Sequence, residues 1–217
     1  EVIWIFTCTR VGFLKKNLFL SISVLLLILI FYKYYNHLFI IFSDSDFLNK
    51  VIMPVGISFF TFQMISYLVD IRKNKKDTLN LKELFCYVTF FPQLVAGPIV
   101  RVSRIIKPLK GINKFILSYN KLKNALALFL IGLSIKVLLA DNLAKLSYFS
   151  YDTFISTSFF ELSFIMLSYS LQIYLDFFGY TICALGLGRL FGLRLPQNFK
   201  SPYKSKNPVE FWRRWHM

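Results

Sequence analysis

The chain alternates between long apolar stretches and short segments rich in lysine and arginine. Four predominantly apolar stretches approach or reach the roughly 17–25 residues that a membrane-spanning helix needs. They are Leu18 to Phe31, extended through Tyr35, then Val51 to Val69, Leu122 to Ala140 and Phe159 to Leu175. Glu1 to Thr9 is expected to be the end of an earlier span. The pattern therefore predicts an all-α, polytopic membrane protein.

Two further apolar regions carry residues that interrupt helices. The stretch from Leu84 to Val100 contains Pro92 and Pro98, and proline removes a backbone donor that lipid cannot replace. We expect this stretch to be a re-entrant or broken helix. The run from Phe177 to Leu193 contains four glycines, which let a helix bend or let two backbones approach closely. It is expected to form a short helix pair or a second re-entrant piece.

Basic residues gather on one side of this arrangement. The chain has 26 Lys and Arg against 11 Asp and Glu, a formal charge of +15. The segments 70–82 and 101–123 are both basic, and both can lie in the cytoplasm only if the apolar stretch between them does not cross. The basic segment 189–214 is expected to return to the same side. The charge thus predicts an orientation and an attraction to anionic lipid.

The amino-acid composition argues against several classes of protein. Apolar residues of the set AVILMFWYC make up 56% of the chain, which excludes a disordered protein and argues against a soluble nucleic-acid-binding protein. The three cysteines lie far apart and indicate neither a disulfide framework nor a metal site. Because the chain begins with Glu1, we expect residues 1–217 to be one membrane-embedded region of a larger domain that is incomplete at both ends.

Polar side chains inside apolar segments are the first candidates for chemistry, because their transfer into lipid is costly. Asp176 is as compatible with a substrate path as with a structural role. The glutamines are expected to form hydrogen bonds between helices, with the lining of a substrate path as the alternative. Lys136 is expected to snorkel or to be paired. The set comprises Gln63, Gln93, Lys136, Glu161, Gln172 and Asp176.

The last segment gives the sharpest local prediction. Asn207, Pro208 and Glu210 match an N-cap, a proline at the first helical position and an acidic residue at the third. A helix should therefore begin at Asn207. Glu210 and Arg214, four residues apart, are expected to pair on its surface.

His216 is the candidate catalytic residue of this segment. If the helix continues, His216 lies about 13 Å along its axis on the face of Trp212, near the middle of the hydrocarbon core. A neutral imidazole is suited to take a proton from a hydroxyl that attacks an acyl carbonyl. A single histidine does not make up a catalytic group of residues. The residues alone therefore leave a structural role for His216 as the alternative.

Five motifs follow one another along the chain: GISFFTFQMISYLVD from Gly56, FFPQLVAGPIVR from Phe90, KVLLADNLA from Lys136, LQIYLDFFGY from Leu171 and LFGLRLPQNFKSPYKSKNPVEFWRRWHM from Leu190. Together they resemble the membrane-bound O-acyltransferase family, and within it the bacterial alginate O-acetyltransferases. The D-alanyl transfer proteins of teichoic acid synthesis are similar too. The chain departs from the family pattern DFSGYSDMAIG at Phe178 and Ile182, and it retains Asp176 and Tyr180.

The resemblance implies a bacterial enzyme of the cytoplasmic membrane that receives an acyl group from a donor such as acetyl-CoA on the cytoplasmic side. The acceptor would be an exported cell-surface polysaccharide or an extracytoplasmic acyltransferase partner, with no bound cofactor or metal. His216 corresponds to a functional histidine of the family, and a second catalytic histidine is expected beyond Met217, so the fragment alone should be inactive. The residues expected to line the substrate path or reaction centre are Asp176, Tyr180, Gln93, Gln172, Trp212 and Trp215.

Two alternatives remain beside this interpretation. The broken helices and buried polar residues alone are also typical of a membrane carrier or scaffold for lipid or polysaccharide precursors. The similarity to D-alanyl transfer proteins leaves transfer to teichoic acid as a second possibility.

Overall fold

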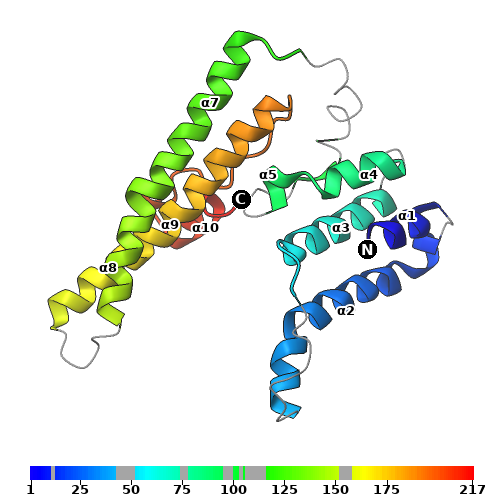
Figure 1. The fold of residues 1–217 in the computed structure, drawn as a ribbon, viewed down its shortest axis with the longest axis horizontal. Helices are drawn as coiled ribbons and strands as arrows, with labels where there is room; N and C mark the ends of the chain where they lie inside the picture. Colours follow the sequence, from blue (N-terminus) through cyan, green and yellow to red (C-terminus); the bar gives the residue numbers. More distant parts are fainter. Residues whose placement is uncertain are drawn as a thin grey trace. The chain divides into compact units, whose positions relative to one another are not determined.

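The computed structural model describes residues 1–10, 13–42, 52–73, 78–94, 100–102, 105, 116–151 and 158–217. The secondary structure of these residues is helical, which confirms the predicted all-α class (Figure 1). The chain divides into two compact units, Glu1–Val95 with Ile99–Asn113 and Ala96–Pro98 with Lys114–Met217. That residues 1–217 form a single membrane-embedded region stays a prediction.

In the first unit, the described residues form five helices. They are α1 (Val2–Arg10), α2 (Phe13–Phe42), α3 (Ile57–Lys73), α4 (Leu81–Val88) and α5 (Phe91–Leu94). Helix α2 continues beyond Tyr35, the end of the predicted span, to Phe42 through residues that are still largely apolar. Helix α2 is kinked at Asn17, whose φ of −132° and ψ of 44° are not helical. Helix α3 begins after Pro54 and Gly56, and Gly56 takes a φ of 75° that disfavours larger residues.

Buried polar groups tie α3 to α4. The Gln63 side chain donates a 2.9 Å hydrogen bond to the carbonyl oxygen of Tyr87, which confirms the interhelical bond expected for this glutamine. The hydroxyl of Tyr87 donates to the carbonyl oxygen of Val100, and that of Tyr67 accepts from the Leu79 amide. Because an unpaired buried polar group is costly, these bonds fix how the two helices pack.

The predicted interruption between Leu84 and Val100 is present. Helix α4 ends at Val88, and the short helix α5 begins at Phe91. Pro92 has no amide hydrogen to donate to the Val88 carbonyl, so one continuous helix cannot run through this point. Neither α4 nor α5 is long enough to cross a bilayer, as expected for a broken helix.

The second unit is built on two long antiparallel helical segments. Helix α7 (Tyr119–Ser134) runs through the π-helix η3 (Ile135–Ala140) into α8 (Asp141–Tyr151), so the helical structure continues past Ala140, the end of the predicted span. Helix α9 (Phe159–Leu190) returns beside them (Figure 1). The chain ends in the 3-10 turn η4 (Pro202–Lys204) and in α10 (Pro208–Arg214).

The predicted break after Asp176 is wrong, because α9 passes through the glycine-rich run as one helix. The glycines serve close packing instead. A Cβ on Gly132 of α7 would lie 2.6 Å from both the Gly179 carbonyl oxygen and the Cys183 nitrogen of α9. A Cβ on Gly186 would lie 2.8 Å from the Phe129 nitrogen. The two backbones are therefore in direct contact, as at small-residue interfaces between membrane helices.

Both ends of α9 are capped by local sequence. Ser158 and Glu161 form a reciprocal capping box, so Glu161 has a structural explanation and is no longer a candidate for chemistry. At the other end, Leu193 N–H donates to the Gly188 carbonyl and Gly192 N–H to the Arg189 carbonyl. This is the Schellman arrangement, and Gly192 has the positive φ of 73° that it requires.

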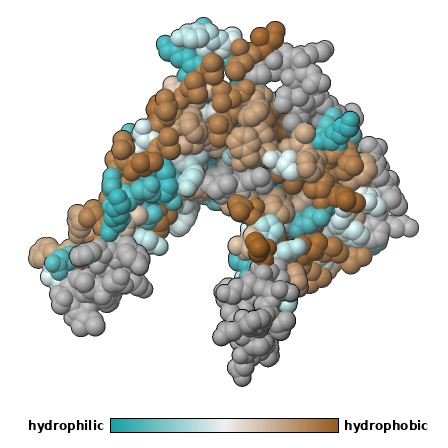
Figure 2. Space-filling model, viewed as in Figure 1, coloured by the Kyte–Doolittle hydropathy of each residue, from teal (hydrophilic) through white to brown (hydrophobic). Residues whose placement is uncertain are grey.

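The surface of the helices is suited to lipid. Within the described ranges, three helices are long and apolar enough to cross a membrane, at Asn17–Tyr35, Tyr119–Ser147 and Phe159–Leu190. Large apolar side chains point outward along them, with Phe19 85% and Met166 71% exposed. Hydrophobic colouring covers much of the visible surface in Figure 2. Exposed apolar area on this scale is not typical of a soluble monomer, so the helices are those of a multi-pass membrane protein.

Candidate functional site

Residues 193–217, here called the return segment, fold back along α9. Asn198 is buried and its side-chain amide donates to the Thr181 hydroxyl at 3.3 Å. The Tyr203 hydroxyl donates to the Ser170 carbonyl at 3.3 Å. The segment therefore lies beside the helix over more than two turns and does not leave its surface.

An aromatic cluster joins the return segment to α9. Tyr174 and Phe178 stack on the helix at 5.5 Å with an interplanar angle of 11°. Phe199 meets both rings edge-on, and Trp215 lies 5.1 Å from Phe199 and 5.7 Å from Tyr174. Edge-to-face contacts of this kind stabilise the packing beyond what the burial of apolar surface alone contributes. The remaining members of the cluster are Phe177, Tyr203 and Phe211.

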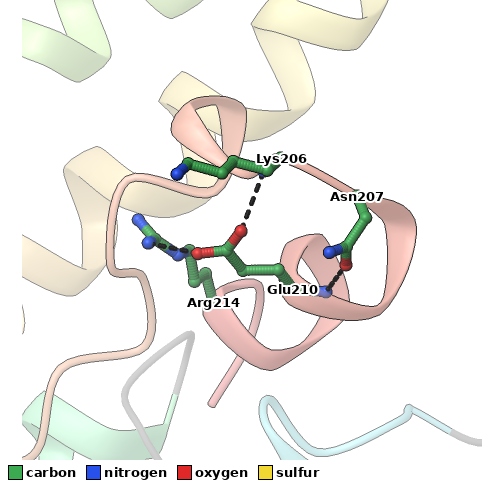
Figure 3. A network of polar contacts seen from close by, with 4 residues as sticks. All are labelled: Lys206, Asn207, Glu210 and Arg214. Atoms are coloured by element: carbon green, nitrogen blue, oxygen red, sulfur yellow. Dashed lines mark hydrogen bonds and ion pairs between the residues drawn. The ribbon is translucent and has the colours of Figure 1, made fainter.

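Helix α10 begins as predicted. Figure 3 shows the Asn207 side chain accepting the Glu210 amide at 2.8 Å, with Pro208 as the first helical residue. The Glu210 carboxylate accepts from the Lys206 amide and pairs with Arg214 at 2.5 Å, which confirms the expected ion pair. The Asn207 cap stabilises the first turn of this seven-residue helix, and the ion pair links its first turn to its last.

This network makes α10 sensitive to acid. The Lys206 amide, and after it the Arg214 side chain, hold the pKa of the Glu210 carboxyl below its ordinary value. The Glu210 carboxylate therefore stabilises the fold fully at pH values above its pKa in the unfolded chain. This stabilisation is lost as the pH falls through the pKa of Glu210 in the folded protein. We expect the fluorescence of Trp212 and Trp215 to change over that acidic range in a Trp4→Phe background. Glu210→Gln should remove the change, and an identical pH profile in both proteins would refute the role of the carboxylate.

The placement of His216 on α10 is wrong. The helix ends at Arg214, Trp215 is extended, and His216 has a φ of 47°. Backbone bonds from Lys200 N–H to the Arg214 carbonyl, and from Met217 N–H to the Asn198 carbonyl, pull the chain away from the helical path. Trp212 and His216 therefore do not share a helix face.

His216 nevertheless lies against α9 near the midpoint of that helix. Its imidazole ring is 5.1 Å from the ring of Phe177 and is exposed. Phe177 lies about 27 Å along the helix axis from Phe159 and about 20 Å from Leu190. The return segment, and not an extension of α10, brings the imidazole to this level of α9.

A second cluster lies where η3 and the start of α8 face α9, and it contains three charges. Lys136 Nζ is 2.5 Å from Asp176 Oδ1 and 2.6 Å from Asp141 Oδ1, and it lies 5.4 Å from the centre of the Tyr180 ring. The three charged side chains are 24 to 43% exposed. The prediction that Lys136 is paired is confirmed. We call Lys136, Asp141, Asp176 and Tyr180 the charge cluster.

The π-helix makes the charge cluster possible. In an α-helix, residues five apart point about 140° away from each other. The Asp141 amide donates to the Lys136 carbonyl, the i to i+5 bond of a π-helix, and this brings the two side chains to one side. Asp141 was not among the predicted site residues. The five-residue spacing of KVLLAD was its only signal.

The predicted site residues thus divide between two faces of α9. At about 100° per residue, Asp176 and Gly179 point toward α7, whereas Tyr174 and Phe178 point toward the return segment. Asp176 and Tyr180 belong to the charge cluster, and Trp215 and His216 belong to the aromatic side.

Trp212, Gln172 and Gln93 are the other predicted site residues. Trp212 is 68% exposed and contacts Phe211. Gln172 is half-buried on α9, and the Gln93 side chain lies outside the described part of the chain. Phe199 and Asn198, which hold the return segment, were not predicted. Over the described residues, no group of three or more His, Cys, Asp or Glu side chains gathers to hold a metal.

Comparison with known proteins identifies the family of the chain. Residues 3–217 match the membrane-bound O-acyltransferase family. The chain is 40% identical to a peptidoglycan O-acetyltransferase of Helicobacter pylori over 77% of its length and 36% of the relative's. It is 34% identical to the probable alginate O-acetylase AlgI of Pseudomonas aeruginosa, over 94% of the chain and 40% of the relative.

A teichoic acid D-alanyltransferase of Bacillus subtilis is 29% identical over 78% of the chain and 43% of the relative. The chain spans about two fifths of the length of these relatives. The predicted resemblance to alginate O-acetyltransferases and D-alanyl transfer proteins is confirmed, and a peptidoglycan O-acetyltransferase joins them. With its family motifs present and its match running from residue 3 to residue 217, the chain belongs to the membrane-bound O-acyltransferase family.

Proposed function

We propose that the protein to which this chain belongs is an O-acyltransferase of a bacterial cytoplasmic membrane. It transfers an acyl group, most simply acetyl, to hydroxyls of an exported cell-surface polysaccharide. The donor is a cytoplasmic acyl compound such as acetyl-CoA, and an extracytoplasmic acyltransferase is a candidate partner. The observation that carries the proposal is an exposed imidazole, His216, held against the middle of a membrane helix in a chain of this family.

The chemistry proposed for His216 is general base catalysis. Its neutral imidazole accepts the proton of the acceptor hydroxyl while the oxygen attacks the acyl carbonyl. The bond from the carbonyl carbon to the donor's leaving atom then breaks, and the proton passes to that leaving group. Phe177 and the backbone bonds on either side of His216 position the ring.

His216→Ala in the full-length protein tests this role. General base catalysis contributes on the order of 10²–10⁴ in rate, so ester-linked acetate on the cell-surface polysaccharide should fall to background. Acetate released by mild alkali is measured by chromatography and normalised to the amount of membrane protein. His37→Ala, which removes the other histidine of the chain, serves as control and should retain acetylation. Unchanged acetylation in His216→Ala would remove His216 from the mechanism.

A second acceptor is favoured by the Bacillus subtilis relative, whose name specifies D-alanyl transfer to teichoic acid. The same alkaline hydrolysate distinguishes the two, because it releases acetate from one product and D-alanine from the other. If neither ester depends on the gene while the intact protein is present in membranes, the carrier or scaffold alternative takes the place of the enzyme.

A further inference from the structure

A basic cavity opens at one end of the α7–α9 pair, away from both the charge cluster and His216. Its volume is about 640 Å³, and it is lined where α7 begins and where α9 ends. Three cationic side chains line it, Lys121, Arg189 and Arg194. Positive charge in the flanking segments predicts that this end of the helices faces the cytoplasm.

The charged side chains that line the cavity are cationic. No acidic side chain is among the described residues that line it. The Lys121 amine also lies 3.1 Å from the Ile116 carbonyl oxygen, a contact that leaves its charge in place. Asn124 and Gln197 add side-chain amides that can donate further hydrogen bonds.

The floor of the cavity is apolar. Leu185, Leu193 and Leu195 line it and are buried. The Schellman turn at Gly192 satisfies the last carbonyls of α9, so these oxygens do not need to be met by a ligand. A ligand that fits this arrangement carries an anionic group at the basic rim and an apolar part toward the leucines.

We propose that this cavity binds the phosphate group of an amphiphilic ligand, with Lys121, Arg189 and Arg194 as the phosphate-binding residues. Arginine forms bidentate hydrogen bonds with phosphate oxygens, and lysine supplies a point charge. Two sources have this chemistry: an anionic phospholipid of the surrounding leaflet and a soluble phosphorylated compound. Basic pockets between membrane helices on the cytoplasmic side are typical binding places for anionic lipid head groups.

The test uses the full-length protein in nanodiscs and a triple variant, Lys121→Gln, Arg189→Gln and Arg194→Gln. The control carries the same change of charge outside the cavity, at the exposed residues Lys123→Gln, Lys200→Gln and Lys204→Gln. One arm measures retention of phosphatidylglycerol against phosphatidylcholine by native mass spectrometry. The other measures binding of coenzyme A by calorimetry. Both variants are first required to elute as the unsubstituted protein does in size-exclusion chromatography.

We expect the cavity variant to bind at least one probe about tenfold or more weakly, and the control variant to stay within about twofold. Loss in the lipid arm assigns the site to phospholipid, and loss in the coenzyme arm assigns it to a soluble compound. Equal binding by the cavity and control variants in both arms overturns the proposal. The inference does not depend on acyl transfer, because both arms measure binding in the absence of an acceptor.

Discussion

Replacement of Gly132 by leucine is expected to separate α7 from α9 and to remove most folded protein from the membrane. Any Cβ at this position lies 2.6 Å from backbone atoms of α9, so the conflict cannot be relieved by turning a side chain. Overpacking of a tight contact costs about 1–3 kcal/mol or more, enough to lower the ratio of folded to unfolded protein by about fivefold to a hundredfold or more. The monodisperse fraction in detergent and its thermal midpoint give the measurement.

Ala127→Leu is the matched control for this substitution. Ala127 is an exposed residue of the same helix, so a leucine there extends into the surroundings without meeting α9. It should leave the folded fraction unchanged. If Gly132→Leu and Ala127→Leu give the same thermal midpoint, the backbone contact at Gly132 is not what holds the two helices together.

Lys136→Met is expected to have the second large effect. The substitution keeps the length of the side chain but leaves the carboxylates of Asp141 and Asp176 without their cation. Removal of one partner from a buried ion pair costs about 3–5 kcal/mol, and partial exposure of these side chains places the loss at the lower end. The thermal midpoint of the full-length protein should therefore fall clearly.

A double variant separates charge balance from simple loss of a side chain. Lys136→Met combined with Asp176→Asn removes one charge of each sign and should recover part of the lost stability. Lys145→Met, an exposed lysine of α8, is the control and should be neutral. If the double variant is no more stable than Lys136→Met alone, charge balance is not what Lys136 supplies.

Much of the fold could be predicted because lipid imposes a simple rule. Apolar stretches long enough to span become helices, and three of the predicted spans lie in α2, in α7 together with η3, and in α9. Pro92 also marked a real interruption, because a missing amide hydrogen has a local effect. The glycine-rich run was misjudged since glycine permits either a bend or a close contact, and the choice depends on Gly132 of another helix.

The candidate site shows the same division between local and tertiary causes. The start of α10 followed from Asn207 and its neighbours, whose effect is confined to one helical turn. The end of α10 did not, because it depends on backbone bonds to Asn198 and Lys200. Backbone hydrogen bonds between residues far apart in the chain leave no pattern in the sequence. The π-helix that joins Lys136 to Asp141 was missed for a related reason, as a helical period of 3.6 places them apart.

The route by which His216 reaches α9 makes the level of the imidazole along that helix independent of the helix itself. A histidine on a spanning helix would have its level in the bilayer fixed by that helix. Here the level depends on the return segment between Gly192 and Trp215, where one residue more or less can shift the ring by up to about 3.5 Å. The position of the imidazole along α9 can thus change through this segment alone, while the membrane helices keep their packing.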